Sequence, residues 1–193
     1  MDPLWAKAAV LTASVVLVAI RAPHGHRSRG IRIVRSRKGG REKALLTLAW
    51  ISFFLPLAWV FVPGPWPGDY LLRPLPFGAG VALYAAGLRL FHLSHADLGT
   101  NWSISLDLRE GHRLVTGGLY HRVRHPMYLA LLLHAAGQAL ALPNAAAGPS
   151  YLVAMAAIVA LRLRPEERML REAFGRDWEE YAARTKRLLP GIW

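Results

Sequence analysis

Five stretches of sequence that are almost free of charge constrain the fold of this chain more than any other feature. They cover residues 4–20, 44–62, 75–93, 127–142 and 145–161. Lys7 and Arg89 are the charged residues inside them. Because an α-helix rises about 1.5 Å per residue, about 20 apolar residues cross the roughly 30 Å hydrocarbon core of a bilayer. The pattern therefore predicts an all-α, multi-pass integral membrane protein with about five transmembrane helices.

The segments that connect the apolar stretches indicate how the helices follow one another. The sequence ALPNAAAGPS at residues 141–150 carries two prolines and predicts a tight turn, so the last two helices should form a helical hairpin. The first stretch lacks a basic start and is followed by arginines, which favours a membrane helix over a cleaved signal peptide. We expect residues 1–193 to form a single membrane domain, in which residues 1–93 supply three membrane helices and a basic loop.

The basic residues gather in the connecting segments. Residues 21–43 hold nine Lys and Arg against one acid, Glu42, residues 94–126 hold four Arg, and residues 164–193 hold seven Lys and Arg. With five helices all three segments fall on one side, which the positive-inside rule assigns to the cytoplasm. The loop 21–43 has no aromatic residue, so attraction to the lipid bilayer explains it better than a nucleic-acid arm, and no nucleic-acid partner is expected.

The composition excludes several kinds of site. The sequence has no cysteine, which excludes disulfides, thiolate zinc sites and a cysteine nucleophile. The eight histidines form no HExxH motif, so no metal is expected. No GxGxxG or Walker sequence occurs either, so a cofactor would need a site built from loops and helices.

A long polar segment, LGTNWSISLDLREGHRLVTGGLYHRVRHP at residues 98–126, precedes the fourth apolar stretch. Pro126 disfavours a helical His125 and suits the first turn of a helix, so Arg124 and His125 are predicted at a helix N-terminus on the membrane surface. Backbone amides and the helix dipole favour an anion there. Two interpretations stay open, an anion site or basic side chains that anchor the helix to headgroups. Arg89 likewise either reaches the membrane surface or faces a partner.

The sequence after the fifth stretch predicts a cytoplasmic helical segment. Pro165 is expected to kink or end the fifth helix near Arg164. Glu166 and Glu167 then fall in the first turn of a new helix, where carboxylates complement the helix dipole. Apolar residues recur along this new helix at amphipathic spacing, with a break expected at Gly175. They are Leu170, Phe174, Trp178 and Tyr181.

Two motifs in the second half of the chain resemble a known family. They are HRLVTGGLYHRVRHPMY at residues 112–128 and RLRPEERMLREAFGRDWEEYAARTKRLLP at residues 162–190. Together they resemble the isoprenylcysteine carboxyl methyltransferases and the related phospholipid methyltransferases, integral membrane enzymes that use S-adenosylmethionine. The resemblance implies that residues 94–193 form a cofactor-binding catalytic half. It also implies a reaction between a cofactor from the cytoplasm and a lipidic or prenylated acceptor in the membrane.

The same resemblance implies a set of site residues. Those implied for catalysis are Arg124, His125, Tyr128 and Glu167. Those implied to bind the cofactor are His112, Leu114, Val115, Thr116, Gly118, Leu119, Tyr120, His125, Arg162, Glu166 and Glu167. Those implied to bind the acceptor are Asn101, Trp102, Ser103 and Arg124. The chemistry agrees, because carboxylates can pair with the cationic groups of the cofactor and arginine can hold a carboxylate.

Three functions stay open beside an isoprenylcysteine carboxyl O-methyltransferase. A phospholipid (phosphatidylethanolamine) N-methyltransferase would use the same cofactor on an amine, which must first lose a proton. An NADPH-dependent reductase of the sterol type shares a similar C-terminal region. A non-enzymatic membrane protein would use its basic loop to bind lipid or a partner. The oligomeric state is not indicated, since the small residues of 78–87 fit packing within one chain or between chains.

Overall fold

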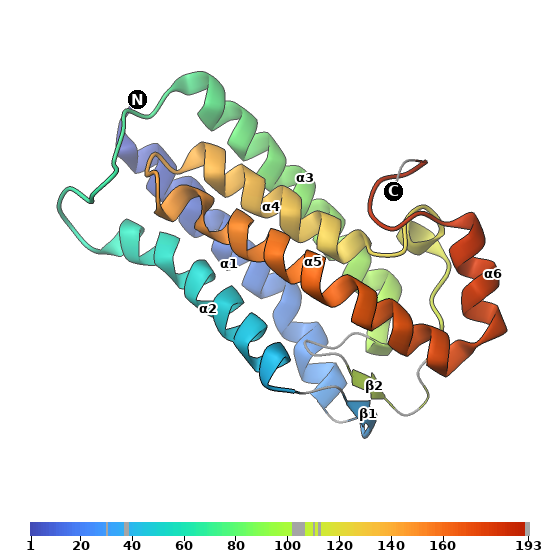
Figure 1. Cartoon of the computed structure of the whole chain (residues 1–193). Coiled ribbons are helices and arrows are strands. Elements are labelled where there is room, and N and C mark those ends of the chain that lie inside the picture. Colours follow the sequence, from blue (N-terminus) through green and yellow to red (C-terminus); the bar gives the residue numbers. More distant parts are fainter. Residues whose placement is uncertain (30, 37–38, 102–106, 110, 112, 192–193) are drawn as a thin grey trace.

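The computed structural model describes residues 1–29, 31–36, 39–101, 107–109, 111 and 113–191. Its α-helices are α1 (Pro3–Arg29), α2 (Gly40–Phe61), α3 (Pro74–Leu98), α4 (Pro126–Ala141), α5 (Ala147–Phe174) and α6 (Arg176–Arg184), and its 3-10 helices are η1 (Gly99–Asn101) and η2 (Gly118–His121). Helices α1 to α5 run side by side, and α6 lies at the end of the bundle where α3 ends and α4 begins (Figure 1). The described parts of the three basic segments of the sequence lie at that same end.

Most of the bundle consists of helices suited to a membrane. Among the described residues, α1, α2, α3 and α5 are long and apolar enough to cross one, and α4 is a shorter apolar helix of 16 residues. A helix forms at each of the five apolar stretches, which confirms that part of the prediction. The chain is a multi-pass integral membrane protein. Its helices extend past the apolar stretches mainly at the end with the basic segments, where charged side chains can reach water or headgroups.

Pro165 does not end the fifth helix, so the prediction of a new helix that begins after it was wrong. Helix α5 continues through it to Phe174, which places Glu166 and Glu167 inside the helix rather than in the first turn of a new one. A proline removes one helical hydrogen bond, but neighbouring helices support a membrane helix across such a position. Here α5 is held on both sides of Pro165, by a salt bridge of Arg162 before it and a hydrogen bond of Glu166 after it.

The amphipathic helix predicted over residues 170–181 is divided between two elements. Gly175, with φ at +52°, ends α5 and precedes α6, so the break expected at this glycine is confirmed. Phe174 therefore packs from α5, whereas Trp178 and Tyr181 are buried on α6. A left-handed glycine turns the chain sharply, and this turn brings α6 across the end of the bundle.

Two short strands depart from the all-α prediction. Strand β1 (Ile33–Ser36) pairs in antiparallel with β2 (Asp107–Arg109), and Ser36 lies opposite Asp107 in this ladder. The pairing joins the basic segment after α1 to the polar segment after α3. Strands this short and this far apart in sequence have no periodic pattern of their own, which is why sequence reasoning missed them.

Glycines bring α3 and α4 into close contact. A Cβ atom on Gly80 would lie 2.7 Å from Gly137 O, one on Gly137 would lie 2.8 Å from Gly80 O, and one on Gly87 would lie 2.8 Å from His134 N. These separations are shorter than real Cβ contacts, so any side chain would push the two backbones apart. At Gly80 and Gly87, the small-residue face of α3 therefore packs within the chain.

Gly137→Ala is expected to destabilise the protein by about 1–3 kcal/mol, because the added methyl group forces apart two backbones that cannot relax independently. Gly78→Ala is the matched control on α3, where a Cβ atom meets nothing within 4 Å. It should leave stability unchanged or raise it slightly, since alanine favours a helix by about 1 kcal/mol over glycine. Thermal unfolding in detergent, followed by circular dichroism, measures both. Equal effects of the two substitutions would contradict the close contact.

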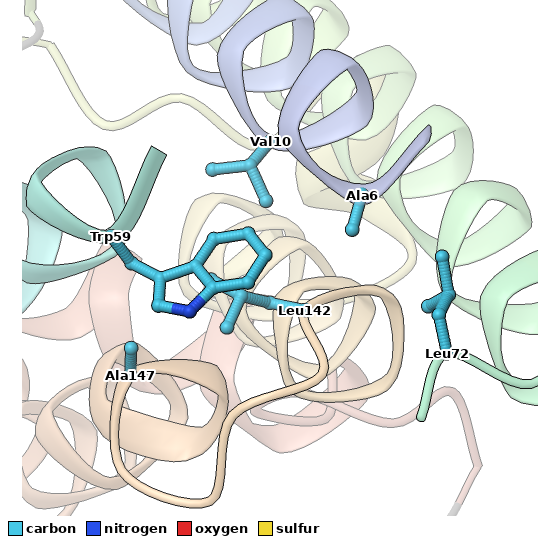
Figure 2. Close-up of a cluster of buried hydrophobic side chains, with 6 residues drawn as sticks. All are labelled: Ala6, Val10, Trp59, Leu72, Leu142 and Ala147. Carbon is cyan, nitrogen blue, oxygen red and sulfur yellow. The ribbon is translucent and has the colours of Figure 1, made fainter. Parts of the chain in front are cut away.

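The end of the bundle away from the basic segments holds a closed apolar core (Figure 2). Trp59 of α2 lies at its centre, and its indole packs against residues from α1, α5 and the connections between helices. The cluster consists of Ala6, Val10, Trp59, Leu72, Leu142 and Ala147. This core joins both hairpin connections, α2–α3 and α4–α5, to the start of α1.

Asp69 in the α2–α3 connection fastens that core to the α4–α5 turn. Its carboxylate accepts hydrogen bonds from Trp59 Nε1 at 2.8 Å, Trp66 N at 2.8 Å and Asn144 Nδ2 at 2.7 Å. Removal from water alone would raise the pKa of Asp69, but these three hydrogen bonds outweigh it and hold the pKa below its usual value. The ionised carboxylate therefore contributes to stability.

Asp69→Ala is expected to lower the unfolding midpoint at neutral pH. Because the folded pKa of Asp69 lies below the unfolded value of about 3.9, its contribution is complete above that value and is lost as pH falls through the folded pKa. The difference in midpoint between wild type and Asp69→Ala should therefore be constant from neutral pH to about pH 4 and should shrink below it. A difference that grows on acidification would contradict this assignment.

Candidate functional site

A cavity of about 720 Å³ lies among α1, α2, α4, α5 and the segment between α3 and α4, with α6 at its mouth. One end of the cavity is polar and the other is apolar. The polar side chains that line it include Asn101, Arg113, Arg124, His125, Tyr128, Arg162 and Glu166. The apolar end is lined by Leu17, Leu45, Phe53, Leu131, Tyr151 and Met155, among others. Charged groups and a space suited to a hydrocarbon chain therefore share one cavity.

Arg124 precedes α4 and is held at the polar end from several directions. Its Nε and Nη2 atoms lie 2.9 and 2.8 Å from Glu167 Oε1, which makes a largely buried, charge-assisted pair. Its Nη1 atom donates to the carbonyl oxygens of Ala182, at 3.0 Å, and Thr185. Its backbone N–H donates to Lys186 O at 2.7 Å. The guanidinium group is thus fixed in place by protein contacts alone.

Glu167 is the centre of this network. Its Oε1 atom also lies 3.3 Å from His125 Nε2, and its Oε2 atom accepts from Nε and Nη2 of Arg187, each at 3.0 Å. Of the residues that the structure describes, those that line the cavity do not include Glu167. Its carboxylate lies behind Arg124 and His125, which do line the cavity, and it orients both.

Glu166, in contrast, lines the cavity directly. The Tyr128 hydroxyl donates to Glu166 Oε2, and His125 Nδ1 lies 3.9 Å from Oε1. Arg162 stands one helical turn before Glu166 on α5, so both side chains reach the same space. The Nη2 atom of Arg162 lies 3.1 Å from Oε1 of Glu42, in the first turn of α2.

The polar segment before α4 is shaped by hydrogen bonds to the side chains of Asp97, at the end of α3, and Asn101. The Leu119 N–H donates to Asp97 Oδ2 at 2.8 Å, and Gly118 approaches the same carboxylate so closely that a Cβ atom would overlap it. Gly118 also has φ at +59°, which glycine adopts without strain. The Arg113 N–H donates to Asn101 Oδ1 at 3.0 Å. These bonds hold residues 113–119 beside the cavity.

Two tyrosines fasten α6 to that segment. The Tyr181 hydroxyl donates to Tyr120 O at 2.7 Å, and both residues line the cavity. Burial raises the pKa of Tyr120 well above its usual value, and the negative charge of Glu166 adds to the effect. Burial also raises the pKa of Tyr181. Both phenols are therefore neutral at physiological pH and supply aromatic surface rather than charge.

Most of the site residues expected from the sequence come together. Those that line the cavity are Asn101, Leu114, Val115, Tyr120, Arg124, His125, Tyr128, Arg162 and Glu166. Glu167 contacts two of them from behind. Thr116, Gly118 and Leu119 are described but do not line the cavity. Trp102, Ser103 and His112 lie outside the described residues.

Three residues that support the site were missed in the sequence. Glu42 pairs with Arg162, Asp97 fixes the loop at Leu119, and Arg187 pairs with Glu167. Glu42 carried a signal, because it is the one acid in the basic segment 21–43. Asp97 and Arg187 carried none, since each meets its partner only through the tertiary fold.

Comparison with known proteins shows that the chain is similar to one family of membrane methyltransferases. A model of the isoprenylcysteine carboxyl methyltransferase (ICMT) family matches residues 79–172. A probable protein-S-isoprenylcysteine O-methyltransferase of Oryza sativa subsp. indica is 34% identical over 89 residues, which are 46% of this chain and 47% of the rice protein. Protein-S-isoprenylcysteine O-methyltransferase B of Arabidopsis thaliana is 30% identical over 140 residues, which are 69% of this chain and 66% of that protein. The chain thus spans about half the length of the rice relative.

A solved structure shares the fold. The structure of the eukaryotic intramembrane Ras methyltransferase ICMT, without a monobody, aligns with a TM-score of 0.53 over 82% of this chain and 55% of that chain. The sequence identity in this alignment is 22%, so the likeness concerns the arrangement of the membrane helices. The family match begins at residue 79, within α3, and so α1 and α2 lie outside it.

Proposed function

Since the chain belongs to the isoprenylcysteine carboxyl methyltransferase family, we propose that it transfers a methyl group from S-adenosylmethionine to the carboxylate of a prenylated cysteine held in the membrane. One observation carries the proposal: a single cavity joins a polar end, with fixed arginines and a glutamate, to an apolar end lined by membrane helices. Such a cavity suits a reaction between a water-soluble donor and a greasy acceptor.

The residues at the polar end fit the cofactor that enzymes of this family use. S-adenosylmethionine carries an aromatic base, a sulfonium, an ammonium and a carboxylate. The cavity offers aromatic surface from Tyr120, Trp178 and Tyr181, and a carboxylate from Glu166 that can pair with a cationic group. Guanidinium groups of Arg113 and Arg124 can receive a carboxylate. When bound there, the cofactor supplies an electrophilic methyl group on sulfur.

The residues of the chain act in this reaction by alignment. A carboxylate acceptor is ionised at neutral pH and would need no base, so the side chains of the cavity would act by holding its oxygen in line with the methyl group that a bound cofactor would supply. Holding two reactants in line supplies about 7–11 kcal/mol of the barrier. Arg124 is suited to this task, because its contacts with Glu167 and with the backbone leave it little freedom to move.

The charges that line the cavity favour an anionic acceptor over an amine. Among the described lining residues, the charged side chains are Arg21, Arg113, Arg124, Arg162 and Glu166. The carboxylates of Glu42 and Glu167 lie behind two of these arginines, and four cations against three carboxylates still leave an excess of positive charge. This excess attracts a negative group and disfavours the protonated amine of phosphatidylethanolamine. This balance supports carboxyl methylation rather than phospholipid N-methylation.

The acceptor is proposed to reach the cavity sideways, between α1 and α2. Val18 on α1 and Trp50 on α2 both line the cavity, and they are 51% and 53% exposed. Residues that line a cavity and also face outward mark its opening, and both lie in the membrane-spanning helices. A prenyl chain could therefore pass from the bilayer into the apolar end without crossing the polar mouth.

The polar mouth is proposed to face the cytoplasm. It lies at the end of the bundle that carries the three basic segments, and the positive-inside rule assigns that end to the cytoplasmic side. In this orientation residue 1 lies outside and the basic C-terminal segment lies in the cytoplasm, so the chain must cross the membrane an odd number of times. Helices α1, α2, α3 and α5 give four crossings, and we propose that the shorter α4 makes the fifth. We propose that residues 1–193 work as one membrane domain with this topology.

The proposal is tested by methyl transfer in nanodiscs. The purified protein is incubated with S-adenosylmethionine labelled in its methyl group and with either N-acetyl-S-farnesylcysteine or phosphatidylethanolamine. We expect label in the farnesylcysteine product, and its release as methanol on treatment with base, because a methyl ester hydrolyses and a methylated amine does not. Base-stable label in the phospholipid would instead establish N-methylation, and label in neither acceptor would refute both activities.

A further inference from the structure

Glu42 is a buried acid in the most basic part of the chain. It lies in the first turn of α2, near the end of the basic segment 21–43, and is 5% exposed. Its Oε1 atom lies 3.1 Å from Arg162 Nη2, and this ion pair joins α2 to α5. Burial of a carboxylate costs free energy that one ion pair rarely recovers in full, so a buried pair is weak evidence of a stabilising role. The arrangement calls for another explanation.

The partner of Glu42 occupies a distinctive place. Arg162 lines the cavity one helical turn, about 6 Å, nearer its apolar end than Glu166. Beyond it on α5 the lining is apolar, with Ile158, Met155 and Tyr151 following in order. The guanidinium group therefore lies at the junction where the charged head of a lipidic acceptor would meet the polar end of the cavity.

Glu42 relates to Arg162 as Glu167 relates to Arg124. In both pairs an arginine lines the cavity, and a carboxylate that is not among the described lining residues holds it from behind. The two carboxylates come from different helices, α2 and α5. Arg124 and Arg162 thus each have a carboxylate behind them, which restricts the directions in which their remaining N–H groups can point.

We propose that Glu42 is a positioning residue that aims Arg162 at the carboxylate of the acceptor, an inference that rests on the function proposed above. Glu42 lies outside the segment that matches the family model, residues 79–172, so the acceptor side of the cavity depends on the N-terminal half of this chain. Arg162, implied by sequence resemblance to bind the cofactor, acts on the acceptor in this assignment.

The test compares two acceptors that differ only in charge. Binding of N-acetyl-S-farnesylcysteine and of its uncharged carboxamide is measured by calorimetry in detergent, with S-adenosylhomocysteine present. Wild type should bind the carboxylate about tenfold or more tighter than the carboxamide, the worth of a hydrogen bond to a charged group. Glu42→Gln should bring this ratio close to one and should leave the affinity for S-adenosylhomocysteine unchanged. A merely structural defect would weaken both acceptors equally.

Two further variants keep the test decisive. Arg162→Gln should lose the carboxylate preference in the same way. If Glu42→Gln does not fold, this variant still tests whether Arg162 recognises the carboxylate of the acceptor. Glu180→Gln on α6 removes an exposed ion pair with Arg176 and should behave as wild type. An unchanged preference in both Glu42→Gln and Arg162→Gln would overturn this inference alone. Failure of wild type to bind either acceptor would overturn the proposed function together with it.

Discussion

Glu167→Ala is expected to lower methyl transfer at least about 100-fold, because a displacement of about 1 Å in an aligned site costs about that much. The carboxylate holds Arg124 and His125 against the cavity and Arg187 behind it. Without it, the guanidinium groups of Arg124 and Arg187 repel each other and His125 loses its hydrogen-bond partner. Activity is therefore expected to fall because Arg124 and His125 are no longer held in place, although Glu167 itself does not line the cavity.

The measurement is a comparison of kcat and of cofactor affinity on monodisperse protein. Glu167→Gln should retain intermediate activity, since its amide oxygen can still accept a hydrogen bond from Arg124 while its charge is lost. This graded response distinguishes orientation from a general loss of structure. Glu180→Ala is the control, because it removes a carboxylate that pairs with Arg176 at an exposed position on α6. Full activity in Glu167→Ala would contradict the role assigned to this carboxylate.

Closing the space between α1 and α2 is expected to abolish methylation of a prenylated acceptor. Val18→Cys and Trp50→Cys place the two cysteines of an otherwise cysteine-free chain on either side of the proposed opening. A reducible cross-linker between them should reduce activity to the background rate, since the acceptor could then neither enter nor leave. Reduction of the linker should restore activity.

The controls separate a closed route from damage to the site. Each single cysteine variant, treated with the same reagent, should remain active. S-adenosylhomocysteine should bind the cross-linked protein as well as the open form, because the cofactor is proposed to enter at the polar mouth. Undiminished activity after complete cross-linking would show that the acceptor takes another path.

The membrane helices could be predicted from sequence because the bilayer imposes a simple rule on length and charge. Each apolar stretch became a helix, and Gly175 broke the chain where a glycine was expected to do so. Pro165 failed as a helix terminator because neighbouring helices hold α5 on either side of it. The strands β1 and β2 could not be foreseen, since their pairing depends on the bundle that brings residues 33–36 and 107–109 together.

Site residues could be predicted from the sequence only where they belong to a recognisable motif. Arg124, His125 and Tyr128 came from RHPxY, and the structure gathers them at one end of the cavity with Glu166. The motif does not show which of two adjacent acids faces the cavity, because that depends on the direction of the α5 face. Glu166 lines the cavity and Glu167 lies behind it.

No sequence motif predicts the apolar end of the cavity. It is built largely by α1 and α2, through residues such as Leu17, Leu45 and Phe53, which carry no chemical signature. Their role follows from packing that joins segments far apart in sequence. The same holds for Glu42, whose partner Arg162 stands 120 positions later in the chain.

We propose that the polar end of the cavity binds an S-adenosylmethionine-type cofactor. The most direct measurement is calorimetry in nanodiscs with S-adenosylhomocysteine and NADPH side by side, on wild type and on Arg124→Ala. We expect saturable binding of S-adenosylhomocysteine by wild type, weaker binding by Arg124→Ala, and no binding of NADPH. Binding of NADPH, or binding of neither ligand by folded protein, would contradict it.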